Sequence, residues 1–161
     1  MVKKAQSVCV YCGSRAGVDP AYEVAATALG HALAEAQMRL VYGAGDIGLM
    51  VAVARAAQLA GGETFGVSPT HLLRREGGKT DLTRFIITET MHERKKVMLM
   101  NADSVVVMPG GAGSLDEFFE VLTWRQLGLH DKPIFLLNIN GYWDPLVALM
   151  DHVVGHDFAD Q

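Results

Sequence analysis

Short runs of β-branched and apolar residues alternate with longer segments of helical periodicity along this sequence. The runs that predict strands are SVCVY (7–11), RLVY (39–42), ETFGVS (63–68), RFIIT (84–88), DSVVVM (103–108) and PIFLLN (133–138). Strands that alternate with helices form parallel sheets, and apolar strands in such sheets are covered by helices on both faces. The sequence therefore predicts an α/β fold, a doubly wound Rossmann-like parallel sheet flanked by helices, as one domain over residues 1–161.

The segments between these strands predict the helices. Their expected bounds are 20–37, 48–60, 91–101 and 114–127, followed by a helix that starts near Pro145. Asp19 and Pro20 suit the N-cap and the first position of the first helix. Apolar spacing predicts one buried face of this helix, formed by Val24, Ala25, Ala28, Leu29, Ala32 and Leu33. The segment 69–82 is predicted to be irregular.

Composition narrows the classes of partner. The chain has 161 residues, a formal net charge of −4 and no block of basic residues. A nucleic-acid partner is not expected, because binding along a phosphate backbone needs many cations on one face. No apolar run approaches the ~20 residues that cross a bilayer, and the N-terminal residues lack the apolar stretch of a secretory signal. We therefore expect a cytoplasmic protein with no membrane partner.

Cys9 and Cys12 have the C-x-x-C spacing of redox and zinc sites. A structural zinc site needs four ligands, and the sequence has no second C-x-x-C and no H-x3-H. An offset of three residues in a strand points side chains to opposite faces of the sheet. We expect a buried thiol and a loop thiol in a reducing compartment, and no metal site.

Two glycine turns lie where a predicted strand leads into a predicted helix. In the turn after residue 108, Gly110, Gly111 and Gly113 precede Ser114 at the expected helix start, an arrangement that binds phosphate. No Lys follows these glycines as it does in a P-loop, so we expect a monophosphate rather than a triphosphate with magnesium. The turn 43–48 matches the dinucleotide pattern G-x-G-x-x-G. NAD binding is the weaker alternative, because the next strand does not end in an acid.

Glu117 has two interpretations. Ser114 and Glu117 have the spacing of a capping box, as do Thr90 and Glu93 at the preceding helix, so Glu117 can serve the helix start alone. The functional interpretation is a carboxylate beside a bound phosphate. It is favoured by the cations Arg94, Lys95 and Lys96, which a helix N-terminus would otherwise disfavour, although a solvated charged face also explains them.

PGGAGSLDE (109–117) resembles the PGGxGTxxE signature of the LONELY GUY (LOG) family, the cytokinin riboside 5′-monophosphate phosphoribohydrolases. Further matches follow in the same order along the chain: CGS (12–14), GLM (48–50), MHERK (91–95), LTWRQLGLHDKP (122–133) and NINGYWDPL (138–146). The chain departs from the family pattern at Ser114, which replaces Thr, and at Ala44, Asp46 and Val51 in the first glycine turn. It also ends at Gln161, earlier than typical relatives, so a further C-terminal segment is an open alternative.

The resemblance implies hydrolysis of the N-glycosidic bond of AMP or an N6-substituted AMP to free base and ribose 5-phosphate. It implies Arg94 and Glu117 as the catalytic pair, no metal or organic cofactor, and a homodimer or higher homo-oligomer. The implied substrate contacts are Glu76, Arg94, Lys95, Gly111, Ala112, Gly113, Ser114, Leu115, Asp116, Glu117 and Thr123. His71 and His92 are candidate proton donors to the departing base, or structural histidines.

Two rival functions stay open from sequence. One is a non-catalytic nucleotide or molybdenum-cofactor-type carrier, which would not need the pair of Arg94 and Glu117. The other is a pyridoxal-phosphate decarboxylase, which would need a Schiff-base lysine with a partner for the pyridine nitrogen. An oligomer interface is one interpretation of the apolar residues on helices 91–101 and 114–127, and burial in the core is the other. These residues are Met91, Met98, Met100, Phe118, Phe119, Trp124 and Leu127.

Overall fold

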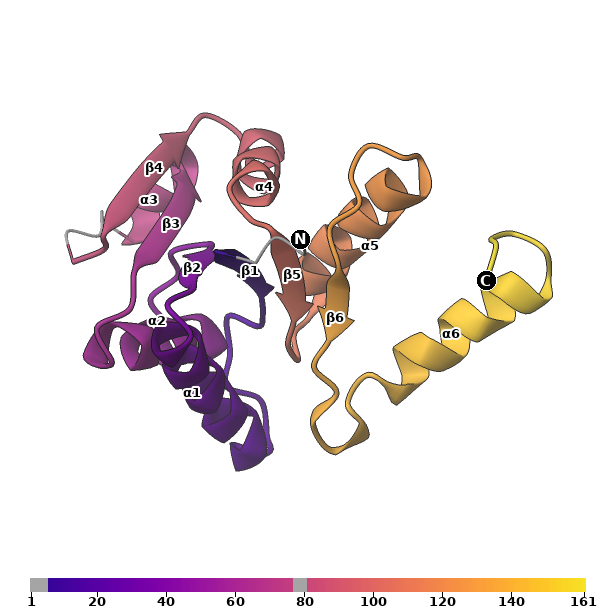
Figure 1. Cartoon of the computed structure of the whole chain (residues 1–161), viewed down its shortest axis with the longest axis horizontal. Helices are drawn as coiled ribbons and strands as arrows, with labels where there is room; N and C mark the ends of the chain where they lie inside the picture. The colour runs from indigo at the N-terminus through magenta and orange to yellow at the C-terminus, as the bar shows by residue number, and fades with distance from the viewer. Residues whose placement is uncertain (1–5, 77–80) are drawn as a thin grey trace.

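The computed structural model describes residues 6–76 and 81–161, and of Glu76 only the main chain. Over these ranges six parallel strands form one sheet in the order β4-β3-β2-β1-β5-β6, with helices on both faces (Figure 1). The strands are β1 (Ser7–Tyr11), β2 (Arg39–Tyr42), β3 (Thr64–Pro69), β4 (Arg84–Thr88), β5 (Ser104–Val107) and β6 (Ile134–Leu136). The helices are α1 (Pro20–Glu35), α2 (Gly48–Leu59), α3 (Thr70–Glu76), α4 (Met91–Met100), α5 (Ala112–Gln126), η1 (Ile139–Gly141) and α6 (Asp144–Gly155). The predicted α/β class and all six predicted strands are confirmed.

The sheet is covered on both sides by separate apolar clusters. Successive strand residues point to opposite faces, so Cys9 packs in the cluster with α4, α5 and α6, whereas Cys12 packs in the cluster with α1 and α2. The chain leaves β1 toward β2 on one side and returns to β5 on the other. The switch in strand order therefore lies beside β1, where ligands bind in folds of this kind.

The start of α1 is as predicted, but its buried face is only partly so. The Asp19 carboxylate accepts from the Ala21 N–H at 2.9 Å, and Pro20 opens the helix. The fully buried residues are Ala26, Gly30 and Leu33, while Val24 is 68% exposed and Ala28 and Ala32 are also exposed. The reason is the close approach of α2, since a Cβ on Gly30 would lie 2.3 Å from the Val53 carbonyl oxygen. The contact with α2 requires glycine at position 30, so the buried face of α1 is centred on Gly30 and not on the predicted apolar stripe.

The prediction that 69–82 is irregular is wrong over its first half, because Thr70–Glu76 forms α3. Leu, Arg and Glu in THLLRRE favour helix locally. The Thr70 hydroxyl also donates to the Thr88 carbonyl at 2.9 Å, which fixes the helix start against β4. Gly77 and Gly78 lie outside the described residues.

The capping box at α4 forms in part. The Thr90 hydroxyl accepts from the Glu93 N–H at 3.2 Å, as predicted. The Glu93 carboxylate accepts instead from the Glu89 N–H at 2.8 Å. Thr90 therefore caps the helix start, and the Glu93 side chain is hydrogen-bonded to the main chain of Glu89, the residue before the N-cap.

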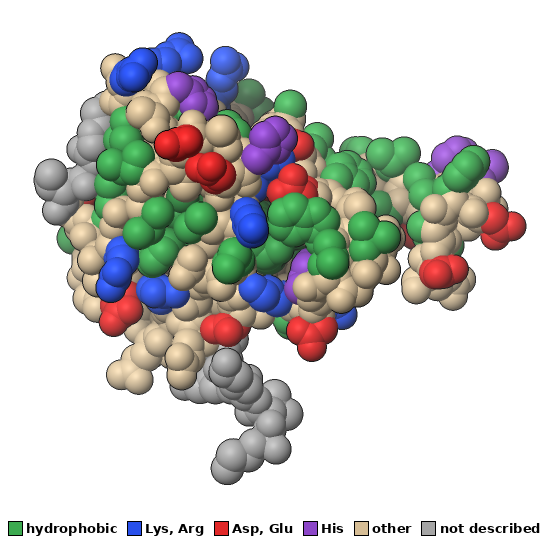
Figure 2. Space-filling model, turned by 90° about the horizontal axis from the view of Figure 1, so that it is seen from above, with side chains coloured by type: hydrophobic (Ala, Val, Ile, Leu, Met, Phe, Trp, Pro, Cys, Tyr) green, Lys and Arg blue, Asp and Glu red, His purple; other side chains and the backbone are tan. Residues whose placement is uncertain are grey.

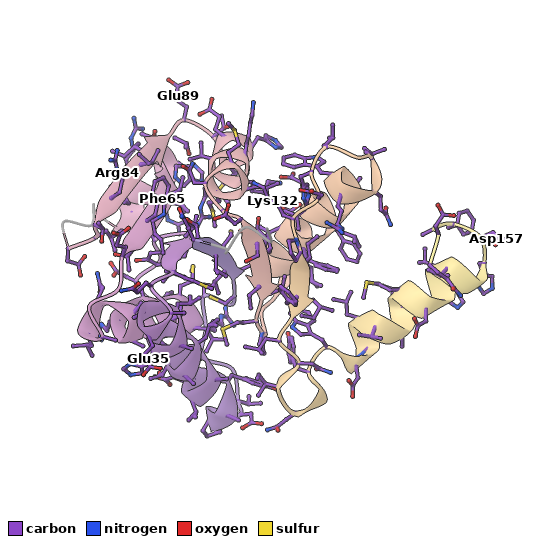
Figure 3. All side chains as sticks on the ribbon, in the orientation of Figure 1. Glu35, Phe65, Arg84, Glu89, Lys132 and Asp157 are labelled. Atoms are coloured by element: carbon purple, nitrogen blue, oxygen red, sulfur yellow. The ribbon has the colours of Figure 1, made fainter. Side chains whose placement is uncertain are left out.

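The last helix, α6, projects from one side of the molecule (Figures 1 and 2). Asp157, just beyond its end, lies at the far tip of this arm (Figure 3). Leu146 anchors α6 in the core, while Val147 and Leu149 are 40% and 51% exposed. None of the described helices has the length and hydropathy that crossing a bilayer requires.

Candidate active site

Three turns meet at the carboxyl edge of the sheet, after β1, β2 and β5. The Gly13 N–H donates to the Pro109 carbonyl at 2.9 Å, and the Gly13 carbonyl accepts from the Leu49 N–H at 3.1 Å. Gly13 thus joins the turn 109–111 to the start of α2, which follows the turn 43–47. A Cβ on Gly13 would lie 3.3 Å from the Gly110 Cα, so the two chains touch there. The two glycine turns therefore lie at the same edge of the sheet.

The helix after β5 begins earlier than predicted. α5 starts at Ala112 with Gly111 as its N-cap, and no side chain caps it. The main-chain N–H groups of residues 111–114 donate to no group in the described part of the chain. Four unpaired N–H groups at the positive end of a helix form an anion-binding site.

The fold itself does not need glycine at two positions of this turn. A Cβ on Gly111 or on Gly113 would meet no atom within 4 Å, and Gly111 has a φ of −103°. Gly110 differs, because its Cβ would lie 2.1 Å from the hydroxyl oxygen of the buried Ser114. Gly110 is therefore required for packing, whereas Gly111 and Gly113 leave open space above the helix start.

Glu117 is not a capping residue. Ser114 lies inside the first turn of α5, and Glu117 lies in the second turn, one turn too late to cap the helix. The capping-box interpretation of this pair is wrong, because the helix begins at Ala112, two residues before Ser114.

The environment of Glu117 changes its acidity. Burial raises the pKa of the Glu117 carboxyl to about 7, and the Arg94 guanidinium nearby opposes part of this shift. Asp116 and Glu120 raise the same pKa further, and Lys95 lowers it. Glu117 is thus a partly buried acid poised near neutral pH, as groups that transfer protons in catalysis commonly are.

Arg94 is a buried cation, 7% exposed, at the same edge. Its Nε donates to the Val67 carbonyl at 3.0 Å, and its Nη2 donates to the Gly43 carbonyl at 2.7 Å. A Cβ on Gly43 would lie 1.8 Å from Nη2, so glycine is needed there to admit the guanidinium. With a weaker contact from Nη1 to the Met91 sulfur, three of its five N–H groups are engaged. Among the described residues, the other two N–H groups have no hydrogen-bond partner.

Lys95 joins α4 to α5. Its ammonium lies 2.8 Å from a Glu120 carboxylate oxygen and 3.1 Å from one of Asp116. Burial lowers the pKa of Lys95, and its bonds to these two carboxylates raise it further than burial lowers it, so the net shift is upward. Lys95 is fully charged at neutral pH and fixes the helix that carries Glu117. Lys96, next to it, is exposed, which fits the solvated-face interpretation.

The remaining candidates lie at different distances from this edge. Ala112 and Leu115 lie in the first turn of α5 with the glycines, and Leu115 packs on the core. Thr123 is exposed on the same helix, roughly 13 Å beyond Ser114 at about 1.5 Å per residue, so one chain does not bring it to the turn. The Glu76 side chain lies outside the described residues. His71 and His92 are both exposed.

A pocket of about 310 Å³ adjoins the turn, and its lining includes residues to which sequence reasoning gave no role. Tyr142, Tyr22, Ser14 and Arg15 line it together with Gly110 and Gly111 of the glycine turn. The tyrosine rings meet edge to face, 5.5 Å apart. The stretch NINGYW (138–143) could have indicated Tyr142 as a site residue, because it follows β6 and so lies at the carboxyl edge of the sheet.

Cys9 and Cys12 are buried free thiols in the two separate clusters. Burial raises the pKa of both thiols well above the usual range, with Glu117 adding to the effect. They are poor nucleophiles and poor metal ligands. Over residues 6–76 and 81–161, no three His, Cys, Asp or Glu side chains come together as a metal site.

Known proteins resemble this chain closely. Residues 50–161 match the family model described as possible lysine decarboxylase. A probable cytokinin riboside 5′-monophosphate phosphoribohydrolase of Oryza sativa subsp. japonica is 44% identical over 152 residues, 94% of this chain and 62% of the relative. A cytokinin riboside 5′-monophosphate phosphoribohydrolase of Arabidopsis thaliana is 42% identical over 151 residues, 94% of this chain and 70% of the relative. This chain thus spans about two thirds of the length of these relatives.

Solved structures share the fold. The molybdenum cofactor carrier protein of Chlamydomonas reinhardtii has a TM-score of 0.71 at 22% identity, over 92% of this chain and 86% of that chain. The molybdenum cofactor binding protein of Rippkaea orientalis has a TM-score of 0.73 at 22% identity, over the same shares. At this identity the likeness extends to the fold alone. The family model and the identity to the plant proteins carry the assignment, and the chain belongs to the LOG family, that of the cytokinin riboside 5′-monophosphate phosphoribohydrolases.

Proposed function

We propose that this protein hydrolyses the N-glycosidic bond of adenosine 5′-monophosphates and releases the free base and ribose 5-phosphate. AMP and N6-substituted AMP are the proposed substrates, which makes the enzyme a nucleoside 5′-monophosphate N-glycosidase. The names of plant relatives at 42–44% identity support this substrate class.

One observation carries the proposal. The same helix, α5, offers four unpaired N–H groups at its start and a carboxyl of raised pKa in its second turn. A phosphate bound at the N–H groups would hold the ribose of a nucleotide beside Glu117. The further proposed substrate contacts are the residues that the family resemblance implies: Glu76, Arg94, Lys95, the run 111–117 and Thr123.

The proposed chemistry breaks one bond and forms one. The bond from C1′ to the base nitrogen breaks, its electron pair leaves with the base, and the sugar develops oxocarbenium character. The Glu117 carboxylate stabilises this charge and takes a proton from the attacking water, whose oxygen bonds to C1′. The base takes up one proton from solvent as it leaves, and Glu117 then releases the proton of the attacking water to solvent, so that one water molecule is added overall. Arg94 favours the ionised form of Glu117 and contacts the ribose or the phosphate.

Incubation of the protein with AMP, followed by chromatography for adenine, tests the proposal directly. Hydrolysis gives adenine and ribose 5-phosphate in equal amounts. A carrier would bind AMP and return it intact, so unchanged AMP after prolonged incubation at neutral pH would overturn the enzymatic function. The absence of an absorbance band for a bound aldimine in protein incubated with pyridoxal phosphate separates this activity from decarboxylation.

The proposal extends to assembly and location. We propose one domain over residues 1–161, a homodimer or higher homo-oligomer, and a cytoplasmic location. A groove of about 400 Å³ between α5 and α6 supports the oligomer, because apolar residues line it on both helices. Thr123 lines this groove too, so a contact of Thr123 with substrate would have to come from a second copy. Of the seven apolar residues considered above for an interface, Met98 and Phe118 are buried core, while Met100, Phe119 and Leu127 are exposed.

A further inference from the structure

Tyr142, which follows β6 in the chain, forms a hydrogen bond to the glycine turn that follows β5. It follows η1 in the turn after β6, and its hydroxyl donates a hydrogen bond to the Gly110 carbonyl. Its ring packs edge to face on Trp143, at 4.7 Å between ring centroids, and on Tyr22. The phenol is therefore fixed on both its ring and its hydroxyl.

The turn that carries Tyr142 is itself tied to its surroundings. The Asn138 side chain accepts from the Trp143 N–H at 2.7 Å, and the Trp143 indole N–H donates to the Val107 carbonyl at 3.3 Å. The Asn140 amide donates to the Asp19 carboxylate at 3.0 Å. The turn that carries Tyr142 is thus hydrogen-bonded both to β5 and to the N-cap residue of α1.

The bond from Tyr142 determines where a neighbouring N–H points. The carbonyl that it holds belongs to the peptide between Gly110 and Gly111, and this peptide is trans. In a trans peptide the C=O and N–H groups point in opposite directions. Fixing the Gly110 oxygen toward Tyr142 therefore aims the Gly111 N–H away from Tyr142. That N–H meets no acceptor in the described residues, and a Cβ on Gly111 would meet only open space.

A glycine pair would otherwise leave this peptide free to rotate, because neither residue has a side chain that restricts it. The opposite side of the pair is already held by the bond from Gly13 to the Pro109 carbonyl. Within the described residues, the Tyr142 hydroxyl is the partner that fixes the Gly110 carbonyl.

We propose that Tyr142 is a positioning residue that orients the Gly110–Gly111 peptide so that the Gly111 N–H binds the 5′-phosphate of the substrate. It thereby makes the site selective for phosphorylated nucleosides. This inference rests on the proposed function, and it adds a residue outside the signature motif and a reason for phosphate selectivity.

The test compares Tyr142→Phe with the matched control Tyr42→Phe. Each variant removes one phenolic hydroxyl, but the hydroxyl of Tyr42, which is buried in β2, makes no hydrogen bond within the described residues. For Tyr142→Phe we expect kcat/KM on AMP to fall roughly 10- to 100-fold, the value of one hydrogen bond to a charged group, chiefly through KM. Tyr42→Phe should behave as the parent protein.

Inhibition by the two products separates positioning from general damage. In Tyr142→Phe the inhibition constant of ribose 5-phosphate should rise by the same factor as KM, whereas that of adenine, which has no phosphate, should not change. An equal rise for both products, or an unchanged KM, overturns the inference.

The proposed function can fail separately, if the parent protein releases no adenine. In that case the dissociation constants of AMP and of ribose 5-phosphate, measured by calorimetry on parent and variant, decide the role of Tyr142. Equal constants in the two proteins would contradict it.

Discussion

At the scale of single residues, the raised pKa of the Glu117 carboxyl favours a functional role over a structural one. Its carboxyl is partly buried near four other charged side chains on α4 and α5, and within the described residues it caps no helix start. Burial of an acid costs stability, and natural proteins retain such groups where activity needs them.

Glu117→Gln should lose AMP hydrolysis and gain stability at high pH. The folded pKa of about 7 exceeds the ordinary 4.5, so between these values the native state keeps a proton that the unfolded chain has lost. Stability of the parent protein therefore falls as pH rises from 4.5 to 7, by up to about 3 kcal/mol. Gln does not titrate, so the melting temperature of the variant should exceed that of the parent at pH 8 by more than at pH 5. The same difference at both pH values would contradict the raised pKa.

Gly113→Ala should weaken phosphate binding without weakening the fold. The added methyl meets no protein atom within 4 Å, and Ala favours helix over Gly by up to about 1 kcal/mol. It would stand in the space proposed for the phosphate, so KM for AMP should rise about tenfold or more while the melting temperature holds or increases. Gly155→Ala on α6 is the control, since its methyl also meets nothing, and it should leave KM unchanged. An unchanged KM in Gly113→Ala would argue against a phosphate at this turn.

At the scale of elements, four helices end in the same way but with different residues. After α1, α2, α5 and α6 the chain passes through a left-handed residue, respectively Gln37, Gly61, Gly128 and Asp157. At α1 the Met38 N–H donates to the Leu33 carbonyl at 2.9 Å and the Gln37 N–H to Ala34 at 3.0 Å, which is a Schellman motif. Only glycine adopts this conformation without strain.

Gln37→Gly should therefore stabilise the protein by about 1 kcal/mol, or a rise of about 2–4 °C in melting temperature. The reverse change, Gly61→Ala, should cost a similar amount, since its Cβ meets no atom within 4 Å and only the backbone strain acts. Thermal unfolding of both variants measures this. A loss of stability in Gln37→Gly would show that side-chain contacts of Gln37 outweigh the strain.

At the scale of the whole molecule, α6 is the helix that extends away from the sheet (Figure 1). It projects beyond the body with its apolar side chains partly exposed, and the groove toward α5 remains open (Figure 2). The helices α1 to α5 each contact strands of the sheet. A second copy of the chain in this groove would bury the apolar side chains of α6 that are exposed in a single chain.

Leu149→Asp should therefore convert the proposed homo-oligomer into a monomer. Leu149 lines the groove and is 51% exposed, so a charge there costs the single chain little but would be buried at an interface. Val24→Asp on α1, at a site 68% exposed, is the matched control and should leave the assembly intact. Sedimentation velocity on the three proteins measures the outcome. A monomeric parent protein, or a Leu149→Asp oligomer, would argue against this interface.

Much of the fold could be predicted from the sequence, because the alternation of strands and helices and the spacing of apolar residues depend on residues that are close together in the chain. The run VVVM (105–108) is apolar throughout, which predicts a strand in the interior of a covered sheet, and β5 lies between β1 and β6. The helix THLLRRE was missed because seven residues give no period to read, and its start depends on the Thr88 carbonyl of another strand. The candidate pair of Arg94 and Glu117 came from the family resemblance. Their burial and the raised pKa of Glu117 came from packing alone.

The sequence by itself determined the alternation of strands and helices, the sheet class and the glycine turns at strand ends, because each depends on residues adjacent in the chain. Only the tertiary structure decided which glycines serve the fold and which leave space. Gly43 admits the guanidinium of Arg94 and Gly110 admits the hydroxyl of Ser114, whereas Gly111 and Gly113 face open space. It also decided that Glu117 is no cap and that Tyr142 holds the turn. These are contacts between segments far apart in the chain, and no local pattern encodes them.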